Sequence, residues 1–197
     1  FIIATKPNNF DLGAAKVYFP ASTFYEDFFI HLEKGNDTIT IHDNSVAAHR
    51  NFTISFDPSK YSTEERKQLF IAHLDSRMWP SYSKTYKRDG SFTTRTRTLG
   101  TYTLVRDSVA PQIRPKNFKE KQWLSNYNYL SLSISDDLSG IDSYSATLNG
   151  KWILMEYEPK TYNFEDNVTS ETECELKVTV TDNVGNSSTY TSSFFRK

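Results

Sequence analysis

The sequence is poor in residues that cross-link a chain or anchor it in a membrane. It has one cysteine, Cys174, which excludes an internal disulfide, so the fold must be held together by its packed core. No apolar run approaches the ~20 residues needed to cross a bilayer, so we expect no membrane-spanning segment. The formal net charge of −1 argues against a nucleic-acid-binding protein that depends on neutralising phosphates.

Aromatic residues, by contrast, are abundant. They make up 15% of the 197 residues, whereas hydrophobic residues as a whole make up 37%. Aromatic and β-branched side chains suit a pleated, half-buried surface, so this composition favours sheet. The length accommodates two domains of about 100 residues each. Because the chain begins at Phe1 rather than Met, we expect a fragment or a processed product.

A joint divides the sequence near its middle. A strand with Tyr102 and Leu104 on one face ends shortly before Pro111. Proline cannot donate to a sheet ladder, so it ends the first sheet and stiffens the link to the next. We therefore predict an all-β chain of two β-sandwich domains in tandem, over residues 1–107 and 108–197.

Short alternating segments fill the first half. Asn51–Phe56 alternates most clearly, and Asp27–Glu33 and Thr38–His42 are predicted to pair as a hairpin. A second hairpin, which joins Tyr82–Lys87 to Ser91–Arg97, is predicted around the turn signal Asp89-Gly90. Residues 1–13 are predicted to be an irregular lead-in.

One segment of the first half carries a helix signal. Ser62 can cap a helix, and Glu65 holds the reciprocal position of a capping box. A polar loop is the alternative, and the sequence leaves both open.

Three motifs in the first half resemble a known family. They are Val-x-x-Pro, Phe-x-Ile-x-Phe-x-Pro and Gly-x-Tyr-x-Leu, at Val17–Pro20, Phe52–Pro58 and Gly100–Leu104. This pattern resembles a ZU5-type or related bacterial β-sandwich, which is the fold that we expect for residues 1–107.

The second half alternates more strictly. In Glu173–Thr181 the alternation turns Cys174 inward, so we expect a small buried hydrophobe rather than a reactive thiol. Lys151–Tyr157 is apolar on both faces and is predicted to be a central strand, entered through the hairpin signal Asn149-Gly150. About seven short strands with regularly spaced turns are typical of an immunoglobulin-like sandwich. The Cys…Trp…Cys core of antibody domains is missing.

Four longer motifs in this half carry a second resemblance. They lie at Phe118–Tyr127, Ile134–Ile141, Leu148–Tyr157 and Val180–Asn186. Together they resemble the C-terminal β-domain of exported Bacteroidetes proteins of the lysostaphin (LytM-type) family, zinc metallopeptidases that cut peptidoglycan cross-links. The resemblance implies an exported protein of the periplasm or cell surface. It also implies an upstream catalytic domain in the same chain as partner, with peptidoglycan or an envelope protein as a further partner.

The catalytic motifs of that family are absent from this chain. Its zinc ligands come as His-x-x-x-Asp and His-x-His, and none of His31, His42, His49 and His73 fits either pattern. Zinc needs three or four convergent ligands, whereas the histidines fall on different predicted segments. We therefore expect no catalytic residue, metal or cofactor in this segment, and surface or hydrogen-bonded histidines are favoured over a metal site.

Two acidic turns offer an alternative for calcium. Asp136-Asp137 and Asp182 with Asn186 are oxygen-rich, as calcium sites are. Asp and Asn in turns more often bond to their own backbone, and the turn interpretation is favoured.

One aromatic cluster is a candidate binding site. Trp123, Tyr127 and Tyr129 follow the joint closely and are able to form a platform for a sugar ring or a peptide stem. Packing against the first domain is the leading alternative.

These observations predict a non-catalytic accessory region of an exported cell-envelope protein related to peptidoglycan metallopeptidases. Such a region would position the catalytic domain or bind a cell-wall or protein partner. The alternative is an adhesin-type module that binds carbohydrate or protein.

Overall fold

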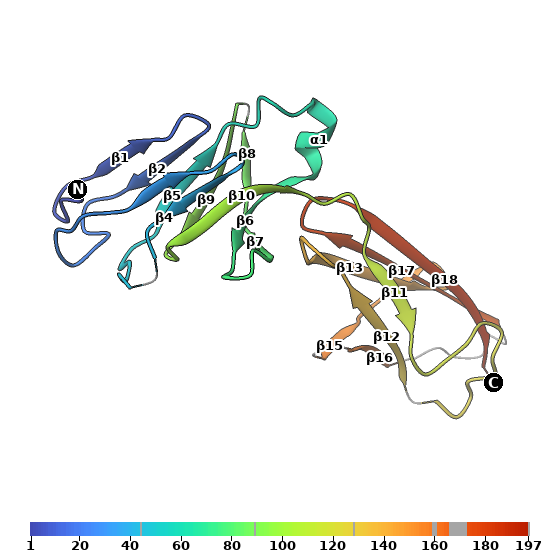
Figure 1. Cartoon of the computed structure of the whole chain (residues 1–197). Helices are drawn as coiled ribbons and strands as arrows, with labels where there is room; N and C mark the ends of the chain where they lie inside the picture. Colours follow the sequence, from blue (N-terminus) through green and yellow to red (C-terminus); the bar gives the residue numbers. More distant parts are fainter. Residues whose placement is uncertain (44, 89, 128, 159–160, 166–172, 197) are drawn as a thin grey trace. The chain divides into compact units, whose positions relative to one another are not determined.

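Antiparallel β-strands form almost all of the regular structure, which confirms the predicted all-β class. The computed structural model describes residues 1–43, 45–88, 90–127, 129–158, 161–165 and 173–196. The chain separates into two compact units, Phe1–Asp107 and Ser108–Lys197 (Figure 1). No helix in these described ranges has the length and apolar character needed to cross a membrane.

Two five-stranded sheets make up the first unit over its described residues (Figure 1). Their strand orders are β1-β2-β5-β9-β8 and β3-β4-β10-β6-β7. The strands are β1 (Asn8–Asp11), β2 (Ala15–Phe19), β3 (Leu32–Lys34), β4 (Thr38–Ile41), β5 (Phe52–Phe56), β6 (Leu69–Leu74), β7 (Pro80–Ser83), β8 (Tyr86–Arg88), β9 (Ser91–Thr96) and β10 (Gly100–Arg106).

Alternation decides which faces of these sheets are buried. Phe52, Ile54 and Phe56 of β5 point into the core, and the residues between them are half-buried. The Phe19 ring lies 4.9 Å from that of Phe52. From the other sheet comes Tyr102, which is fully buried and donates its hydroxyl to the Thr98 carbonyl at 2.6 Å. The first core is thus an aromatic-rich layer between two sheets.

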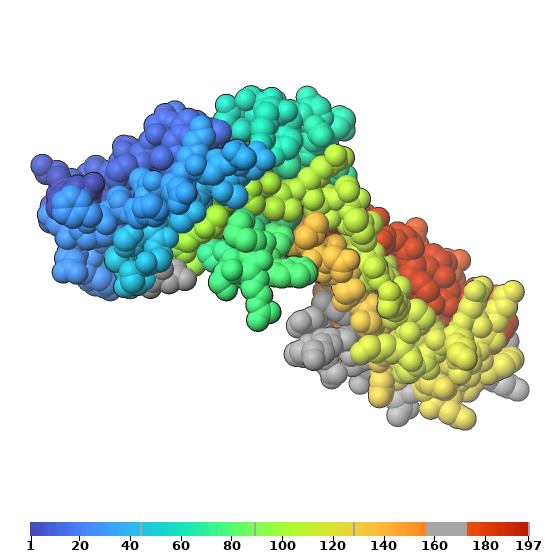
Figure 2. All heavy atoms as spheres, in the orientation of Figure 1, coloured from blue at the N-terminus to red at the C-terminus, as the bar shows by residue number. Residues whose placement is uncertain are grey.

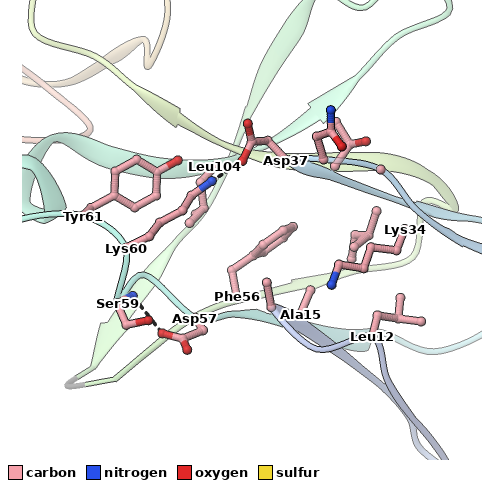
Figure 3. A pocket seen from close by; sticks show the side chains of 15 residues that line it. Leu12, Ala15, Lys34, Asp37, Phe56, Asp57, Ser59, Lys60, Tyr61 and Leu104 are labelled. Carbon is pink, nitrogen blue, oxygen red and sulfur yellow. Dashed lines mark hydrogen bonds and ion pairs between the residues drawn. The ribbon is translucent and has the colours of Figure 1, made fainter.

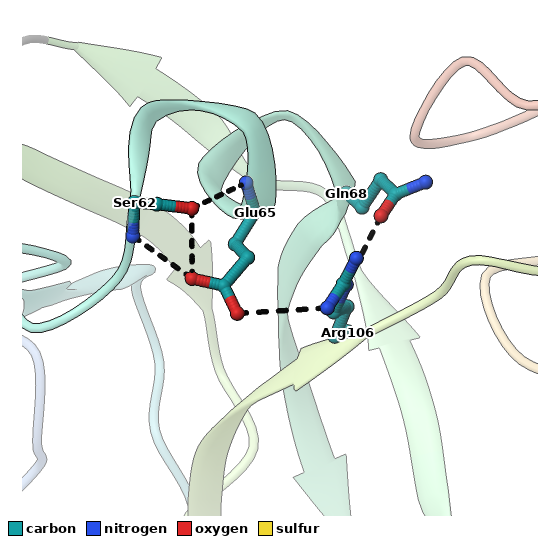
Figure 4. A network of polar contacts seen from close by, with 4 residues as sticks. All are labelled: Ser62, Glu65, Gln68 and Arg106. Carbon is teal, nitrogen blue, oxygen red and sulfur yellow. Dashed lines mark hydrogen bonds and ion pairs between the residues drawn. The ribbon is translucent and has the colours of Figure 1, made fainter.

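One short helix, α1 (Thr63–Gln68), precedes β6 at the surface of the first unit (Figure 2, teal). Its N-terminus is the capping box that the sequence offered as one of two alternatives. The backbone N–H of Glu65 donates to Ser62 Oγ at 3.3 Å, and the N–H of Ser62 donates to Glu65 Oε2 at 2.9 Å (Figure 4). The second carboxylate oxygen of Glu65 lies 3.5 Å from the Arg106 guanidinium, which ties the helix to the end of β10.

The second unit has the immunoglobulin-like strand order. Its two four-stranded sheets run β11-β12-β16-β15 and β14-β13-β17-β18 over the described residues. In chain order these are the ABED and C′CFG sheets of an immunoglobulin-like sandwich, as predicted. The strands are β11 (Gln112–Pro115), β12 (Tyr129–Ser135), β13 (Ile141–Leu148), β14 (Lys151–Ile153), β15 (Glu156–Glu158), β16 (Thr161–Glu165), β17 (Glu173–Asp182) and β18 (Ser187–Phe195).

The centre of this unit follows the alternation closely. Every second residue of β17, from Cys174 to Asp182, is buried, and those between them are exposed or half-buried. Cys174 is fully buried beside Leu176 and Val178, which confirms its predicted place as a small core residue.

The prediction for Lys151–Tyr157 is wrong. Only β14 (Lys151–Ile153) lies in the C′CFG sheet, at its edge next to β13, and β15 then pairs with β16 in the other sheet. Trp152 and Leu154 are 68% and 65% exposed. A run that is apolar on both faces therefore changes sheet here instead of crossing a core.

Two boundaries in the first half also differ from the prediction. The lead-in contains β1, which pairs along its full length with β2. The strand expected over Asp27–Glu33 is limited to β3. Before it, Asp27 Oδ1 accepts the Ala4 N–H at 2.8 Å, and Phe28 forms only an isolated β-bridge with Ile2. The predicted hairpin between β3 and β4 is confirmed.

The hairpin predicted around Asp89-Gly90 is β8 paired with β9, although Asp89 itself lies outside the described residues. The residues before β8 differ from the prediction. Pro80–Ser83 forms β7, which pairs with β6 in the other sheet.

Candidate functional site

A pocket opens at one end of the first sandwich, where three connections meet (Figure 3). They are the β1–β2 turn, the β3–β4 turn and the loop from β5 to α1. The cavity volume is about 110 Å³. Its apolar lining comes from the core edge and consists of Leu12, Ala14, Ala15, Ile39, Phe56 and Leu104. The pocket is therefore an opening between the two sheets that charged turns surround.

The β1–β2 turn shapes one side of the pocket. The Gly13 N–H donates to Asp11 Oδ1 at 2.8 Å, and Gly13 has a φ of +84°, a conformation that favours glycine. A β-carbon at this position would stand 3.1 Å from the Lys34 Nζ. The turn thus lies directly under the Lys34 ammonium, which makes no ion pair among the described residues.

The opposite side carries an ion pair and an aromatic ring. Lys60 Nζ is paired with Asp37 Oδ1, and it lies 5.0 Å from the centroid of the Tyr61 ring. The hydrogen bond to Asp37 is the main cause that raises the pKa of Lys60. In Figure 3, Lys34 and Lys60 lie on opposite sides of the Phe56 ring. Both lysines border one apolar surface.

The remaining carboxylate at the mouth is held in its charged form. Asp57 Oδ1 accepts the Ser59 N–H at 2.8 Å, and this backbone hydrogen bond is the main cause that lowers the pKa of Asp57. A general acid needs a raised pKa, and a nucleophilic lysine needs a lowered one. Asp57 and Lys60 shift the other way, so Asp57 lacks the pKa direction of a general acid and Lys60 that of a nucleophile.

The predicted aromatic cluster has three different environments. Trp123 is 57% exposed and its ring centroid lies 5.3 Å from that of Phe195. Tyr127 packs against the second core, and its hydroxyl accepts the Gln122 Nε2–H at 3.2 Å. Tyr129 begins β12 and is 53% exposed. Among the described ring contacts, none joins any two of the three.

The acidic turns of the second unit bond to their own backbone, as the turn interpretation predicts. Asp182 Oδ1 accepts the N–H groups of Val184, Gly185 and Asn186 at 2.7 to 3.0 Å. Asp136 Oδ2 accepts the Gly140 N–H at 2.8 Å. Carboxylate oxygens of Asp136 and Asp182 lie within 4.8 Å of one another, close enough for one cation.

Two of the histidines lie closer together than their spacing suggested. The His31 N–H donates to His42 Nδ1 at 3.2 Å, and the His42 N–H donates to the His31 carbonyl at 2.7 Å. His73 lies elsewhere, with its ring 5.0 Å from that of Tyr102. These contacts are hydrogen bonds and ring packing.

Sequence reasoning missed the pocket, because its residues come from turns that lie far apart in the chain. The usable signal was the charge in those turns, at Lys34, Asp37 and Asp57–Lys60, on either side of strands that alternate strictly.

Comparisons with known proteins address the first unit most directly. No curated protein matches this sequence. The solved structure of a polysaccharide lyase matches with a TM-score of 0.30 and 7% identity, over 97% of this chain and 35% of the lyase. This chain thus spans about a third of that lyase, and so low a score transfers neither fold nor function. The model of the Zu5-like domain matches residues 1–107, in agreement with the resemblance read from the first-half motifs. Since this match covers more than half of the sequence, the chain belongs to the Zu5-like domain family.

Proposed function

We propose that this chain is a non-catalytic, carbohydrate-binding accessory region of an exported cell-envelope protein. The observation that carries the proposal is the pocket of the first unit, in which an apolar surface around Phe56 lies between two lysines. A sugar ring has apolar C–H faces and polar edges, so it matches an apolar floor with charged and hydroxyl groups around it. The lowered pKa of Asp57 and the raised pKa of Lys60 keep both groups charged at the mouth, where they are able to bond to a polar ligand.

The finer proposal concerns the wall polymer and the rest of the protein. The resemblance of the second half to lysostaphin-type exported proteins supports peptidoglycan as the carbohydrate and an upstream peptidase domain as the neighbour in the chain. In this proposal the protein acts at the periplasm or cell surface. Lys34, which is unpaired among the described ion pairs, would face a carboxylate of the peptide stem.

Retention of the full 197-residue chain on purified peptidoglycan sacculi tests the proposal. Ala14 lines the pocket and is exposed, so Ala14→Phe fills the mouth without entering the core. We expect retention of the native chain, loss of retention in Ala14→Phe and in Lys34→Glu, and native retention in Lys6→Glu. Lys6 is an exposed lysine that does not line the pocket. Equal retention of all four proteins, or release of wall fragments by the chain alone, would contradict the proposal.

An adhesin-type module that binds carbohydrate or protein is the second candidate. The strongly exposed aromatics Tyr25, Phe29 and Trp79 favour it, because such side chains are common anchors at interfaces. Binding to host or envelope proteins that Ala14→Phe leaves unchanged would support this candidate instead.

A further inference from the structure

The outward face of the sheet β1-β2-β5-β9-β8 carries charge of mainly one sign. A shallow hollow of about 450 Å³ lies on it, lined by Thr53, Tyr86, Arg88, Ser91, Thr93 and Arg95. None of the described residues that line this hollow carries a carboxylate. Both arginines are exposed, and neither guanidinium has a hydrogen bond or an ion pair among the described side-chain contacts.

The strand register shows how these side chains share one surface. Thr53 lies opposite Arg95 across β5 and β9, Thr93 lies opposite Tyr86, and Ser91 lies opposite Arg88. Successive residues of a strand point to opposite faces, so Ser91, Thr93 and Arg95 all point outward, away from the buried Phe92 and Thr94.

The same face continues across the neighbouring strands. Lys16 lies opposite Ser55, and Tyr18, which is 41% exposed, lies opposite Thr53. Two described carboxylates lie next to Lys16 and Ser55 on this face: Asp11, which is paired with Lys16 at 3.3 Å, and Asp57. At the other edge, the Lys84 ammonium lies 5.8 Å from the centroid of the Tyr86 ring. In the described part of the chain, no carboxylate forms an ion pair with Arg88, Arg95 or Lys84.

We propose that this face, which we call the basic face (Lys16, Tyr18, Thr53, Tyr86, Arg88, Thr93 and Arg95), binds an acidic polysaccharide. The guanidinium fork matches a carboxylate with two parallel hydrogen bonds. Tyr18 and Tyr86 offer aromatic surface for sugar rings, and the threonines offer hydroxyls for the sugar hydroxyls.

The spacing of the two arginines argues for a polymer rather than a small anion. Arg88 lies opposite Ser91, and Arg95 is four residues further along β9. At about 3.4 Å per residue this separates their backbones by about 14 Å, so two side chains that stand upright on the sheet are spaced for separate carboxylates. A chain of uronic acid residues presents carboxylates repeatedly and is able to reach both. A nucleic acid is disfavoured, because the whole chain has a net charge of −1.

This proposal extends the proposed carbohydrate-binding function to a second surface. The choice of a polysaccharide as the ligand rests on that proposed function. The two are separable by mutation, because no residue that lines the hollow of the basic face lines the pocket around Phe56.

The test uses the full chain with polygalacturonate as probe and its methyl-esterified form as the neutral control of the same backbone. We expect binding to the acid form alone, weaker at about 200 mM salt than at about 20 mM. Arg88→Gln/Arg95→Gln should weaken this binding by about tenfold or more, while Ala14→Phe leaves it unchanged. The matched control is Arg77→Gln/Arg114→Gln, which removes the same charge from exposed arginines outside the face.

Each other result has a defined meaning. Arg88→Lys/Arg95→Lys should bind more tightly than Arg88→Gln/Arg95→Gln but less tightly than the native chain. Lysine restores the positive charge but not the paired N–H donors of the guanidinium group. Equal affinity for the esterified polymer, equal loss in the two double variants, or tighter binding of a single-stranded oligonucleotide would overturn the proposal. An unchanged melting temperature of Arg88→Gln/Arg95→Gln excludes misfolding as the cause of its loss.

Discussion

Lys60 and Asp37 form an ion pair that joins the loop after β5 to the turn between β3 and β4 (Figure 3). These two connections lie on different sheets of the first sandwich. The pair therefore holds one side of the pocket mouth, and it does so at the surface, with side chains that are 54% and 65% exposed.

Replacing Asp37 with Asn tests what this pair contributes. The pKa of Lys60 is raised mainly by Asp37, so it should fall back towards its usual value, as a lysine NMR titration would measure. A lysine whose pKa is higher in the folded than in the unfolded protein stabilises the fold at pH values below its unfolded pKa. Any stability from the pair is therefore present at neutral pH and is lost as the pH rises through the folded pKa of Lys60. For so exposed a pair the loss should stay below about 1 kcal/mol. If Asp37→Asn lowers the free energy of unfolding by several kcal/mol in thermal denaturation, the ion pair stabilises more of the first unit than the pocket mouth.

The capping box of α1 gives a prediction for stability at acid pH (Figure 4). Ser62→Ala removes the side-chain cap and should cost about 1 kcal/mol of unfolding free energy. The pKa of Glu65 is lowered below its usual 4.5, chiefly by the Ser62 backbone N–H. A carboxyl group whose pKa is lower in the folded than in the unfolded protein stabilises the fold at pH values above its unfolded pKa. The contribution of Glu65 is therefore lost as the pH falls below 4.5 and through its folded pKa. Denaturant unfolding at pH 7 and in this acid range measures both effects. Glu64→Gln is the control, because Glu64 lies outside the box, and it should leave the acid loss unchanged.

The second unit offers a sharper test in its last turn. Asp182 is 2% exposed and accepts three backbone N–H groups. Asp182→Ala leaves those donors without their acceptor and should cost about 1–3 kcal/mol or more. Asp182→Asn keeps an acceptor oxygen but loses the charge, so it should cost less. Chemical denaturation of the three proteins ranks them. An Asn variant as unstable as the Ala variant would mean that the charge, and not the hydrogen-bond geometry, stabilises the turn.

The sequence predicted the fold well where burial alternates and poorly where it does not. The strands around Phe52 and Cys174 bury one face each, and a period of two in the sequence marks them directly. The prediction for Lys151–Tyr157 was wrong because this run is not one strand. It begins as an edge strand of one sheet and then passes to the other sheet. The pocket was not predictable in the same way, since a hydrophobic pattern records which face is buried but not which distant turns meet. Lys60 and Asp37 are 23 residues apart, and only the fold brings them together.

Gly100 gives the last prediction, at the start of β10. It has a φ of +128°, and an added β-carbon would stand 2.7 Å from His73 Nε2. Gly100→Ala should therefore destabilise the first unit by about 1–3 kcal/mol, from backbone strain together with displacement of the His73 ring from Tyr102. Gly90→Ala is the matched control, because Gly90 also has a positive φ, of +75°, but has nothing within 4 Å of the added carbon. Unfolding of Gly100→Ala in a His73→Ala background separates the two causes: the collision with the ring disappears there, and only the strain remains. If Gly90→Ala proves as costly as Gly100→Ala, or if His73→Ala brings no relief, the approach of His73 to this backbone is not what requires glycine.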